Sequence, residues 1–310
     1  MRRVARLFAF ALLAALAALA WTFAPVRLAP DPPGRWQFTA LPQAHPPAGL
    51  RIARMTTGAV HSRQGLAVRG GSLATETEFA MAPILVDHPD GKLLIDSGFG
   101  RDVDRHFAQA RWLMRALTRY TRATPAVDAL AARGVDASAL RGIVLTHAHW
   151  DHVSGVADFA GTSVLVPQAE RDFIAGGSEE SALIRGFRDV RYEVYAFEGG
   201  EYLGFPAHHD FFGDGSVVAV PAPGHTPGSV VVFVTLPDGV RYAFVGDLSW
   251  TREGIEWPAE RPWLPRSLAD ADAESARAQL RHLHALHEAF PTLRIVPAHD
   301  VAALADVPAL

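Results

Sequence analysis

Hydrophobic residues along the chain show two patterns. In short segments they alternate with polar residues, and in longer segments they recur with helical spacing. Alternation marks residues 81–89 and 92–98, which are joined by Asp90-Gly91. Asp-Gly between two apolar runs is a strong hairpin signal. Further apolar runs predict strands over residues 142–149, 163–167, 216–236, 242–247 and 294–300. The run at 216–236 is expected to be two strands that flank a turn rich in proline and glycine.

Helical spacing appears between these runs. It predicts helices over residues 105–120, 126–134, 169–177 and 270–290. Gly134 is placed to end the second helix as a C-cap. In the last helix, Leu280, Leu283, Ala285 and Leu286 can line one apolar face. Two β-rich blocks with helices between and outside them predict a layered α/β domain and not the regular alternation of a Rossmann fold.

The N-terminus has the layout of an export signal. Three arginines precede an apolar run from Leu7 to Ala20, and Ala18 and Ala20 suit cleavage by a signal peptidase. The apolar stretch continues to Val26, so residues 7–26 are also long enough to tether the chain to a membrane. Residues 1–24 are therefore predicted to be a signal peptide or an N-terminal membrane anchor. The protein is expected to be exported and periplasmic, either soluble after cleavage or anchored to the inner membrane.

The remaining chain divides into a linker and one domain. Seven prolines between residues 25 and 47 predict a Pro-rich tether over residues 25–49. No second break of this kind follows, which favours a single domain over residues 50–310.

The composition limits the kinds of partner and of metal site that the chain can have. The formal net charge of −4 gives no basic field for nucleic acid, so nucleic acid is not expected as a partner. The chain has no cysteine, which excludes disulfides, thiolate metal sites and a cysteine nucleophile. Any metal must be held by histidine and carboxylate groups, which suit zinc, iron or manganese.

The stretch VLTHAHWDHVSG holds four groups that can bind a metal. His147 and His149 lie two residues apart, so an extended backbone would direct both side chains the same way. Asp151 and His152 follow where the strand must turn. Three more candidates stand at the ends of other predicted strands, namely His225, Asp247 and His299. Loops at strand ends converge into sites in α/β domains, so these residues are expected to meet.

This ordered set resembles the metallo-β-lactamase superfamily across roughly residues 51–300. The surrounding motifs LLIDSG (with Asp96), PGHTPGS, VGD and VPAHD match as well. The resemblance implies an αββα sandwich with two divalent metal ions at its edge, expected to be Zn²⁺. It assigns the first ion to His147, His149 and His225, the second to Asp151, His152 and His299, and a bridging role to Asp247. Asp96 would support the ligand loops.

The resemblance also implies a hydrolase acting on a small-molecule substrate. A hydroxide bound between the metals would attack a carbonyl carbon, and Asp151 would be catalytic, orienting the hydroxide and passing its proton to the leaving atom. Only a short segment follows His299, which argues against the branch with a glutathione-binding C-terminal domain. True β-lactamases generally lack an acidic residue at the bridging position, so Asp247 argues against that branch. A lactone or related ester, as in acyl-homoserine lactone hydrolases, is therefore the expected substrate.

Other readings stay open on the sequence. They are a mononuclear iron persulfide dioxygenase, a β-lactamase or thioesterase of the same superfamily, and a catalytically idle binding module. In the lactonase branch a tyrosine often assists the leaving group, and Tyr192, Tyr195 and Tyr202 are all candidates here.

Overall fold

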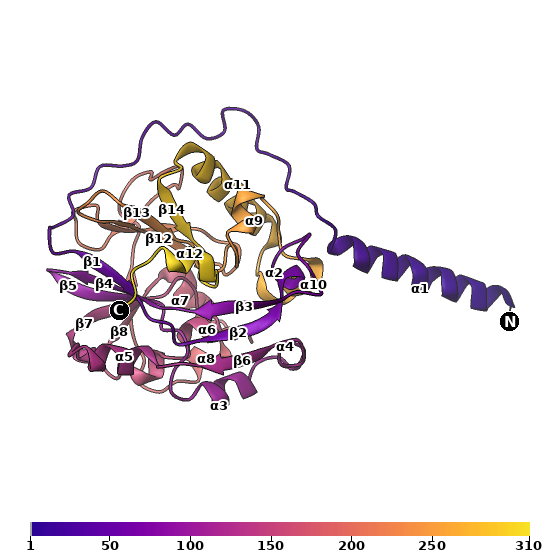
Figure 1. Cartoon of the computed structure of the whole chain (residues 1–310), viewed down its shortest axis with the longest axis horizontal. Coiled ribbons are helices and arrows are strands. Elements are labelled where there is room, and N and C mark those ends of the chain that lie inside the picture. The colour runs from indigo at the N-terminus through magenta and orange to yellow at the C-terminus, as the bar shows by residue number, and fades with distance from the viewer. Residues whose placement is uncertain (1) are drawn as a thin grey trace.

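Two β-sheets lie face to face, and helices cover the outer face of each (Figure 1). The computed structural model describes residues 2–310. The first sheet has the order β1 (Arg51–Arg54), β4 (Ile84–His88), β5 (Gly91–Ile95), β7 (Leu140–Val144), β8 (Ser163–Pro167) and β9 (Arg191–Tyr195). The second has the order β10 (His209–Asp210), β11 (Val217–Pro221), β12 (Val230–Thr235), β13 (Arg241–Phe244) and β14 (Leu293–Val296).

The helices are short except α1 (Arg2–Thr22) and α11 (Ala273–Ala289). They are α1 (Arg2–Thr22), α2 (Gln64–Ala67), α3 (Val103–Ala108), α4 (Trp112–Leu117), α5 (Ala126–Ala132), α6 (Trp150–Val153), α7 (Gln168–Ala175), α8 (Ala182–Arg185), α9 (Glu253–Glu256), α10 (Trp263–Ala269), α11 (Ala273–Ala289) and α12 (Val301–Ala305). Single 3₁₀ turns span Ala137–Ala139 and Val156–Asp158.

The core follows from the two-residue alternation of the strands. In β12, Val230, Val232 and Val234 pack between the two sheets, whereas Val231 and Phe233 pack on the outer face against α11. The first sheet does the same, with its outer face covered by α5, α7 and α8. The central strands of each sheet are therefore buried on both faces, which explains why strands such as β8 and β12 are almost wholly apolar. The αββα sandwich predicted from the sequence is confirmed.

One sequence prediction fails around residue 110. The single helix expected over residues 105–120 is two short helices, α3 and α4, followed by the strand β6 (Arg119–Arg122). The strand β6 pairs with β2 (Gly58–Arg63), which also pairs with β3 (Glu76–Met81) to form a small third sheet. Pairing with a distant strand overrides the local helical spacing here, because β-structure depends on its neighbours more than on its own pattern.

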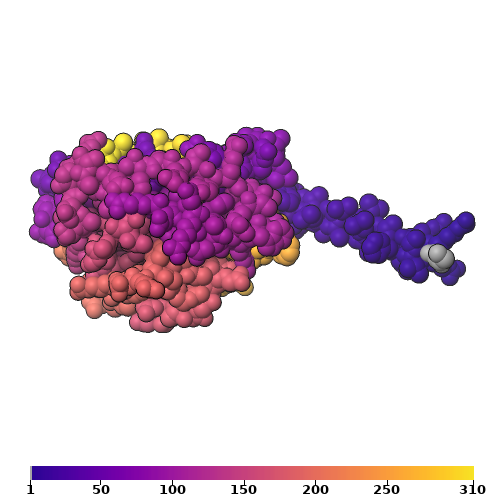
Figure 2. Space-filling model, turned by 90° about the horizontal axis from the view of Figure 1, so that it is seen from below, coloured from indigo at the N-terminus to yellow at the C-terminus, as the bar shows by residue number. Residues whose placement is uncertain are grey.

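The helix α1 stands away from the rest of the molecule (Figures 1 and 2). None of its residues is buried, and it is long and apolar enough to cross a membrane. Its C-terminal end is held at the domain surface, where the Nη2 of Arg69 donates a 2.8 Å hydrogen bond to the carbonyl of Trp21. The Arg69 guanidinium also lies 4.4 Å from the centre of the Trp21 ring. Both contacts bring the end of α1 to the domain.

Residues 25–49 form no helix or strand and run along the domain. Trp36 of this segment stacks on His282 of α11, with ring centres 3.9 Å apart. The Nε2 of His282 lies 2.7 Å from the carbonyl oxygen of Leu203, and the imidazole is almost fully buried. Burial lowers the pKa of His282 to about 4. Folding therefore favours the neutral form of this histidine.

This burial predicts a loss of stability in mild acid. Below about pH 6.5 the unfolded chain binds a proton at His282 that the folded chain excludes until about pH 4. The stability that the neutral His282 contributes is fully present above pH 6.5 and is lost as the pH falls from 6.5 towards about 4. On going from pH 7 to pH 4.5, we expect the unfolding free energy of the parent to fall by up to about 3 kcal/mol more than that of a His282→Phe variant. Urea unfolding at both pH values measures the difference, and equal losses in the two proteins would contradict it.

Candidate metal centre

The candidate ligands lie at one edge of the sandwich because the strands that precede them point to that edge. The parallel strands β5 and β7 lead into Asp96 and His147. The parallel strands β13 and β14 lead into Asp247 and His299. The antiparallel strands β11 and β12 turn at His225 on the same side. Residues far apart in the sequence therefore meet at a single point, as predicted.

Three groups of potential ligand atoms form there, each with its atoms within 4.8 Å of one another. The first group contains His147, His149 and His225, and all three side chains are buried. The other two groups are His147, His152 and Asp247, and Asp151, His152 and His299. All seven residues that the sequence analysis singled out take part. Asp151 is the most exposed of the carboxylates, with 13 % of its side chain accessible.

Four of the five histidines in these groups are oriented through their Nδ1 atoms. The Nδ1 of His152 lies 2.8 Å from the Asp96 carboxylate, and that of His225 lies 2.8 Å from the Asp270 carboxylate. For the other two the partners are the Thr146 hydroxyl, 3.1 Å from His147, and the Ala80 carbonyl, 2.9 Å from His299. Acceptors in these places put the proton on Nδ1 and leave the Nε2 lone pair directed at the centre.

The Nε2 atoms face one another at short range. Those of His147 and His225 are 3.2 Å apart, and those of His152 and His299 are 3.3 Å apart. With the Nδ1 atoms protonated, His147 and His225 bring two lone pairs together in a buried space, which is unfavourable unless a cation lies between them. The second pair differs: burial alone would lower the pKa values of His152 and His299, but the neighbouring carboxylates raise both. Burial and the neighbouring histidines hold the pKa values of His147 and His149 well below the ordinary range, so both are neutral. The donor set fits divalent metal ions.

The Asp247 carboxylate lies between the two halves of the centre. Its Oδ1 is 2.9 Å from the Nε2 of His299 and 3.1 Å from that of His152. Its Oδ2 is 3.5 Å from the Nε2 of His225 and accepts a 2.7 Å hydrogen bond from the indole N–H of Trp250. Burial alone would raise the pKa of Asp247, but His299 and His152 lower it well below its usual value. Asp247 is therefore ionised and offers one oxygen to each half.

Asp96 has the supporting position that the resemblance implied. Its carboxylate accepts hydrogen bonds from the backbone N–H and the hydroxyl of Thr146, both at 2.8 Å, besides its contact with His152. Its backbone has a φ of +57°, a left-handed conformation that is strained for a residue other than glycine. Such strain persists where the surroundings fix the residue, as these contacts do.

Sequence reasoning missed three other supporting residues. Asp270 holds His225, and Arg261 contacts both Asp270 and the Asp247 carbonyl. Glu170 of α7 is completely buried, and its carboxylate accepts hydrogen bonds from the Ala148 N–H at 2.6 Å and the Thr226 hydroxyl at 2.6 Å. Burial raises the pKa of Glu170 to about 7. All three looked like ordinary charges on predicted helices or loops, and only their burial distinguishes them.

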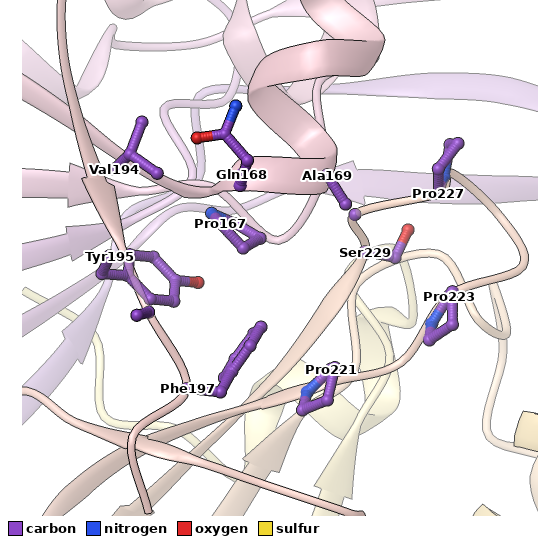
Figure 3. A pocket seen from close by; sticks show the side chains of 12 residues that line it. Pro167, Gln168, Ala169, Val194, Tyr195, Phe197, Pro221, Pro223, Pro227 and Ser229 are labelled. Carbon is purple, nitrogen blue, oxygen red and sulfur yellow. The ribbon is translucent and has the colours of Figure 1, made fainter.

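The candidate tyrosines lie elsewhere. Tyr202 packs against Phe233 in the outer core of the second sheet, and Tyr192 lies under the Arg171 guanidinium. Tyr195 is buried beside a cavity that is lined by the ends of β8 and β9 and by the β11–β12 turn (Figure 3). The aromatic side chain that does reach a candidate ligand is that of Trp250, through the hydrogen bond to Asp247.

Comparison with known proteins agrees with this geometry. The family model of the metallo-β-lactamase superfamily matches residues 82–299. A protein of Mycobacterium tuberculosis named as a probable metallo-hydrolase is 31 % identical over 238 residues, which cover 70 % of this chain and 73 % of the relative. The N-acyl homoserine lactonase AttM of Agrobacterium fabrum is 26 % identical over 236 residues, covering 72 % and 82 %.

Solved structures show the same fold. An N-acyl homoserine lactone hydrolase, with the product N-hexanoyl-L-homoserine at its catalytic metal centre, superposes with a TM-score of 0.68 at 18 % identity over 84 % of this chain and 97 % of its own. The dizinc quorum-quenching lactonase AidC gives a TM-score of 0.58 at 18 % identity, covering 84 % and 90 %. The prediction of a metallo-hydrolase is confirmed at the level of the family. The chain belongs to the metallo-β-lactamase superfamily.

Proposed function

We propose that this metallo-hydrolase uses two divalent metal ions to open a lactone or a related ester of a small molecule. The observation that carries the dinuclear reading is the Asp247 carboxylate, whose two oxygens face different histidine groups. A carboxylate that serves a single ion has no need of this arrangement. The lactone reading is supported by relatives named as N-acyl homoserine lactonases.

In this proposal the ligands divide as the resemblance implied. His147, His149 and His225 would hold the first ion, Asp151, His152 and His299 would hold the second, and Asp247 would serve both. Zn²⁺ suits a set of imidazole and carboxylate donors, as do iron and manganese. Divalent ions at such a site supply Lewis acidity and a source of hydroxide at neutral pH.

The proposal assigns proton transfer to Asp151. Its Oδ2 lies 3.5 Å from the Nε2 of His299, and it is only partly buried, unlike Asp247. The side chain therefore faces both the donors and the solvent from which a substrate enters. We assign it the removal of a proton from the attacking water and its delivery to the alkoxide oxygen released when the carbon–oxygen bond breaks.

The N-terminal parts of the chain belong to the same proposal. Residues 1–24 would be a signal peptide or a membrane anchor, residues 25–49 a tether, and residues 50–310 the hydrolase domain. The exposed apolar helix α1 supports this division. The substrate would then meet the enzyme in the periplasm, on the outer side of the inner membrane.

A metal count tests the dinuclear proposal against its main alternative. We expect two metal ions per chain when the full-length protein is analysed by elemental analysis, with turnover of an acyl-homoserine lactone or an aryl ester. The physical reason is the second set of ligands, Asp151, His152 and His299. A single ion at His147, His149 and His225 would leave this set unused. One iron per chain without hydrolysis would favour an oxygenase instead. A thioester and a β-lactam complete the substrate panel.

Replacement of Asp151 tests its catalytic role. An Asp151→Asn variant keeps the size of the side chain but cannot take up a proton, so we expect kcat to fall about 10²- to 10⁴-fold. Metal content is measured in the same preparation, because a loss of metal would account for a loss of rate. The control is Asp90→Asn in the β4–β5 turn, where the Asp90 side chain is 80 % exposed. Full activity in the Asp151 variant would remove this residue from the mechanism.

Glu170 should control how firmly the metal is held. Its carboxylate joins the loop of His147 and His149 to the loop of His225, since its oxygens accept from Ala148 on one side and from Thr226 and Gly228 on the other. In Glu170→Gln one of these N–H or O–H donors meets an amide NH₂ group. We expect metal affinity to fall about 10- to 100-fold in a chelator competition, as for other residues that orient ligands. The partly exposed Glu180→Gln is the control, and unchanged affinity in Glu170→Gln would contradict the prediction.

A further inference from the structure

Exposed apolar side chains gather at the end of the domain from which α1 leaves. Between residues 27 and 310, seven large hydrophobic side chains are exposed, and five of them belong to α4, α10, the loop after α2 and the residue after α9. In Figure 1 these helices lie at the end of the domain that faces α1, and Figure 2 shows the same end from below. A group of this kind marks an interaction surface. The five residues, called the anchor-side surface below, are Leu73, Trp112, Leu117, Trp257 and Trp263, which are 44 % to 73 % exposed.

Contacts between the segments make these residues parts of one surface. The Leu117 carbonyl accepts a 3.1 Å hydrogen bond from the Ser62 hydroxyl, near the end of β2 that leads into α2. The Leu73 side chain lies against the second residue of α2. From the first residue of α2, the Gln64 amide donates a 2.9 Å hydrogen bond to the carboxylate of Glu253 in α9. The apolar residues near α4, α2 and α9 therefore adjoin one another.

The C-terminal end of α1 is fixed beside this surface. The Arg69 side chain is only 6 % exposed, and it donates to carbonyls in the last turn of α1 and just after it. The backbone N–H of Gly70 donates a 3.0 Å hydrogen bond to the Phe23 carbonyl. Farther along, the Arg27 guanidinium lies 3.4 Å from the centre of the Trp257 ring. These contacts set where the helix leaves the domain, so a membrane crossed by α1 would begin at this surface.

We propose that the anchor-side surface rests on the phospholipid bilayer that α1 crosses, so that the domain is docked on the membrane as well as tethered to it. The 21 residues of α1 span about 31 Å, and the hydrocarbon core of a bilayer is about 30 Å thick. With α1 across the core, the anchor-side surface lies at the level of the lipid headgroups. Three of its five residues are tryptophan, which is enriched at that level. This inference rests on the proposed retention of α1 as an anchor and is independent of the proposed hydrolysis.

The arginine beside Trp257 fits the same partner. The Arg27 side chain is exposed, and it follows α1 by only a few residues. Cations next to a membrane span interact with the phosphates of anionic lipids. A second copy of the chain could also cover an apolar surface, but it would not account for the position of this surface at the exit of a membrane-length helix.

Site-specific labels test the docking, because the chain has no cysteine and a single introduced cysteine carries one label. A nitrobenzoxadiazole fluorophore is attached in separate full-length variants, Leu73→Cys, Trp112→Cys and Trp263→Cys. The control is Asp90→Cys in the β4–β5 turn, at the opposite end of the domain in Figure 1. In vesicles of phosphatidylethanolamine and phosphatidylglycerol, we expect the first three labels to show a blue shift and to lose emission when spin-labelled lipid is added. The label at position 90 should show neither change.

The contrary outcomes separate the anchor from the docking. The intact mass of protein isolated from the producing cells shows whether α1 is kept, and a mass that lacks α1 would refute the anchor and this proposal with it. If α1 is kept but the three labels are quenched no more than the control, the anchor stands and the docking is refuted. A blue shift that grows with protein density, without quenching by the lipid, would assign the surface to a second copy of the chain and overturn the proposal.

A pair of double variants, each labelled at position 263, tests the apolar character of the surface. In Trp112→Glu with Leu117→Glu, two carboxylates would have to enter the headgroup layer, so quenching by spin-labelled lipid should be lost. Both positions are exposed, so the substitutions leave the core intact. Trp112→Phe with Leu117→Met keeps the surface apolar and should be quenched like the parent. Equal quenching in the two double variants would contradict docking through this surface.

Discussion

The geometry of the metal centre depends on the hydrogen bonds at the Nδ1 atoms of its histidines. Asp96, Asp270, Thr146 and the Ala80 carbonyl each accept a hydrogen bond from the Nδ1 of one imidazole, so that the Nε2 atoms converge. Without these acceptors the rings would be free to rotate and the tautomers would be mixed. The rest of the fold brings the acceptors to that edge, since Asp96 follows β5 and Ala80 lies in β3 of the small third sheet.

The layered α/β domain and the candidate ligands were predicted from the sequence because both have local signatures, whereas the αββα sandwich was implied by the resemblance to the superfamily. The alternating runs of β4 and β5 and the apolar run of β12 are visible in the chain, and so is the spacing of His147, His149 and His152. The third sheet was not visible, because β6 takes its conformation from pairing with β2 and its own residues have helical spacing. Turn and helix periodicity cannot reveal such a long-range partner.

The supporting residues were hidden for a different reason. Glu170 is one of several acidic residues in helical segments, and nothing in its neighbourhood separates it from a solvated charge. Its role arises from its complete burial between two ligand loops, which only the packing of α7 against the β11–β12 turn creates. Gly228 allows that packing, since any side chain there would collide with the backbone of α7. Gly228 of the PGHTPGS motif is thus required for packing as well as for the turn.

The order of the ligands along the chain sets when the centre can form. His147, His149 and His152 leave the ribosome close together, but His299 follows only after β14, late in the domain's sequence. A nascent chain, or a chain cut before β14, has all donors of the group around His225 and lacks one donor of the group around Asp151. Closing so long a loop also costs chain entropy that only the finished second sheet can repay. The full set of ligands can therefore assemble only after the whole domain has been translated and has folded.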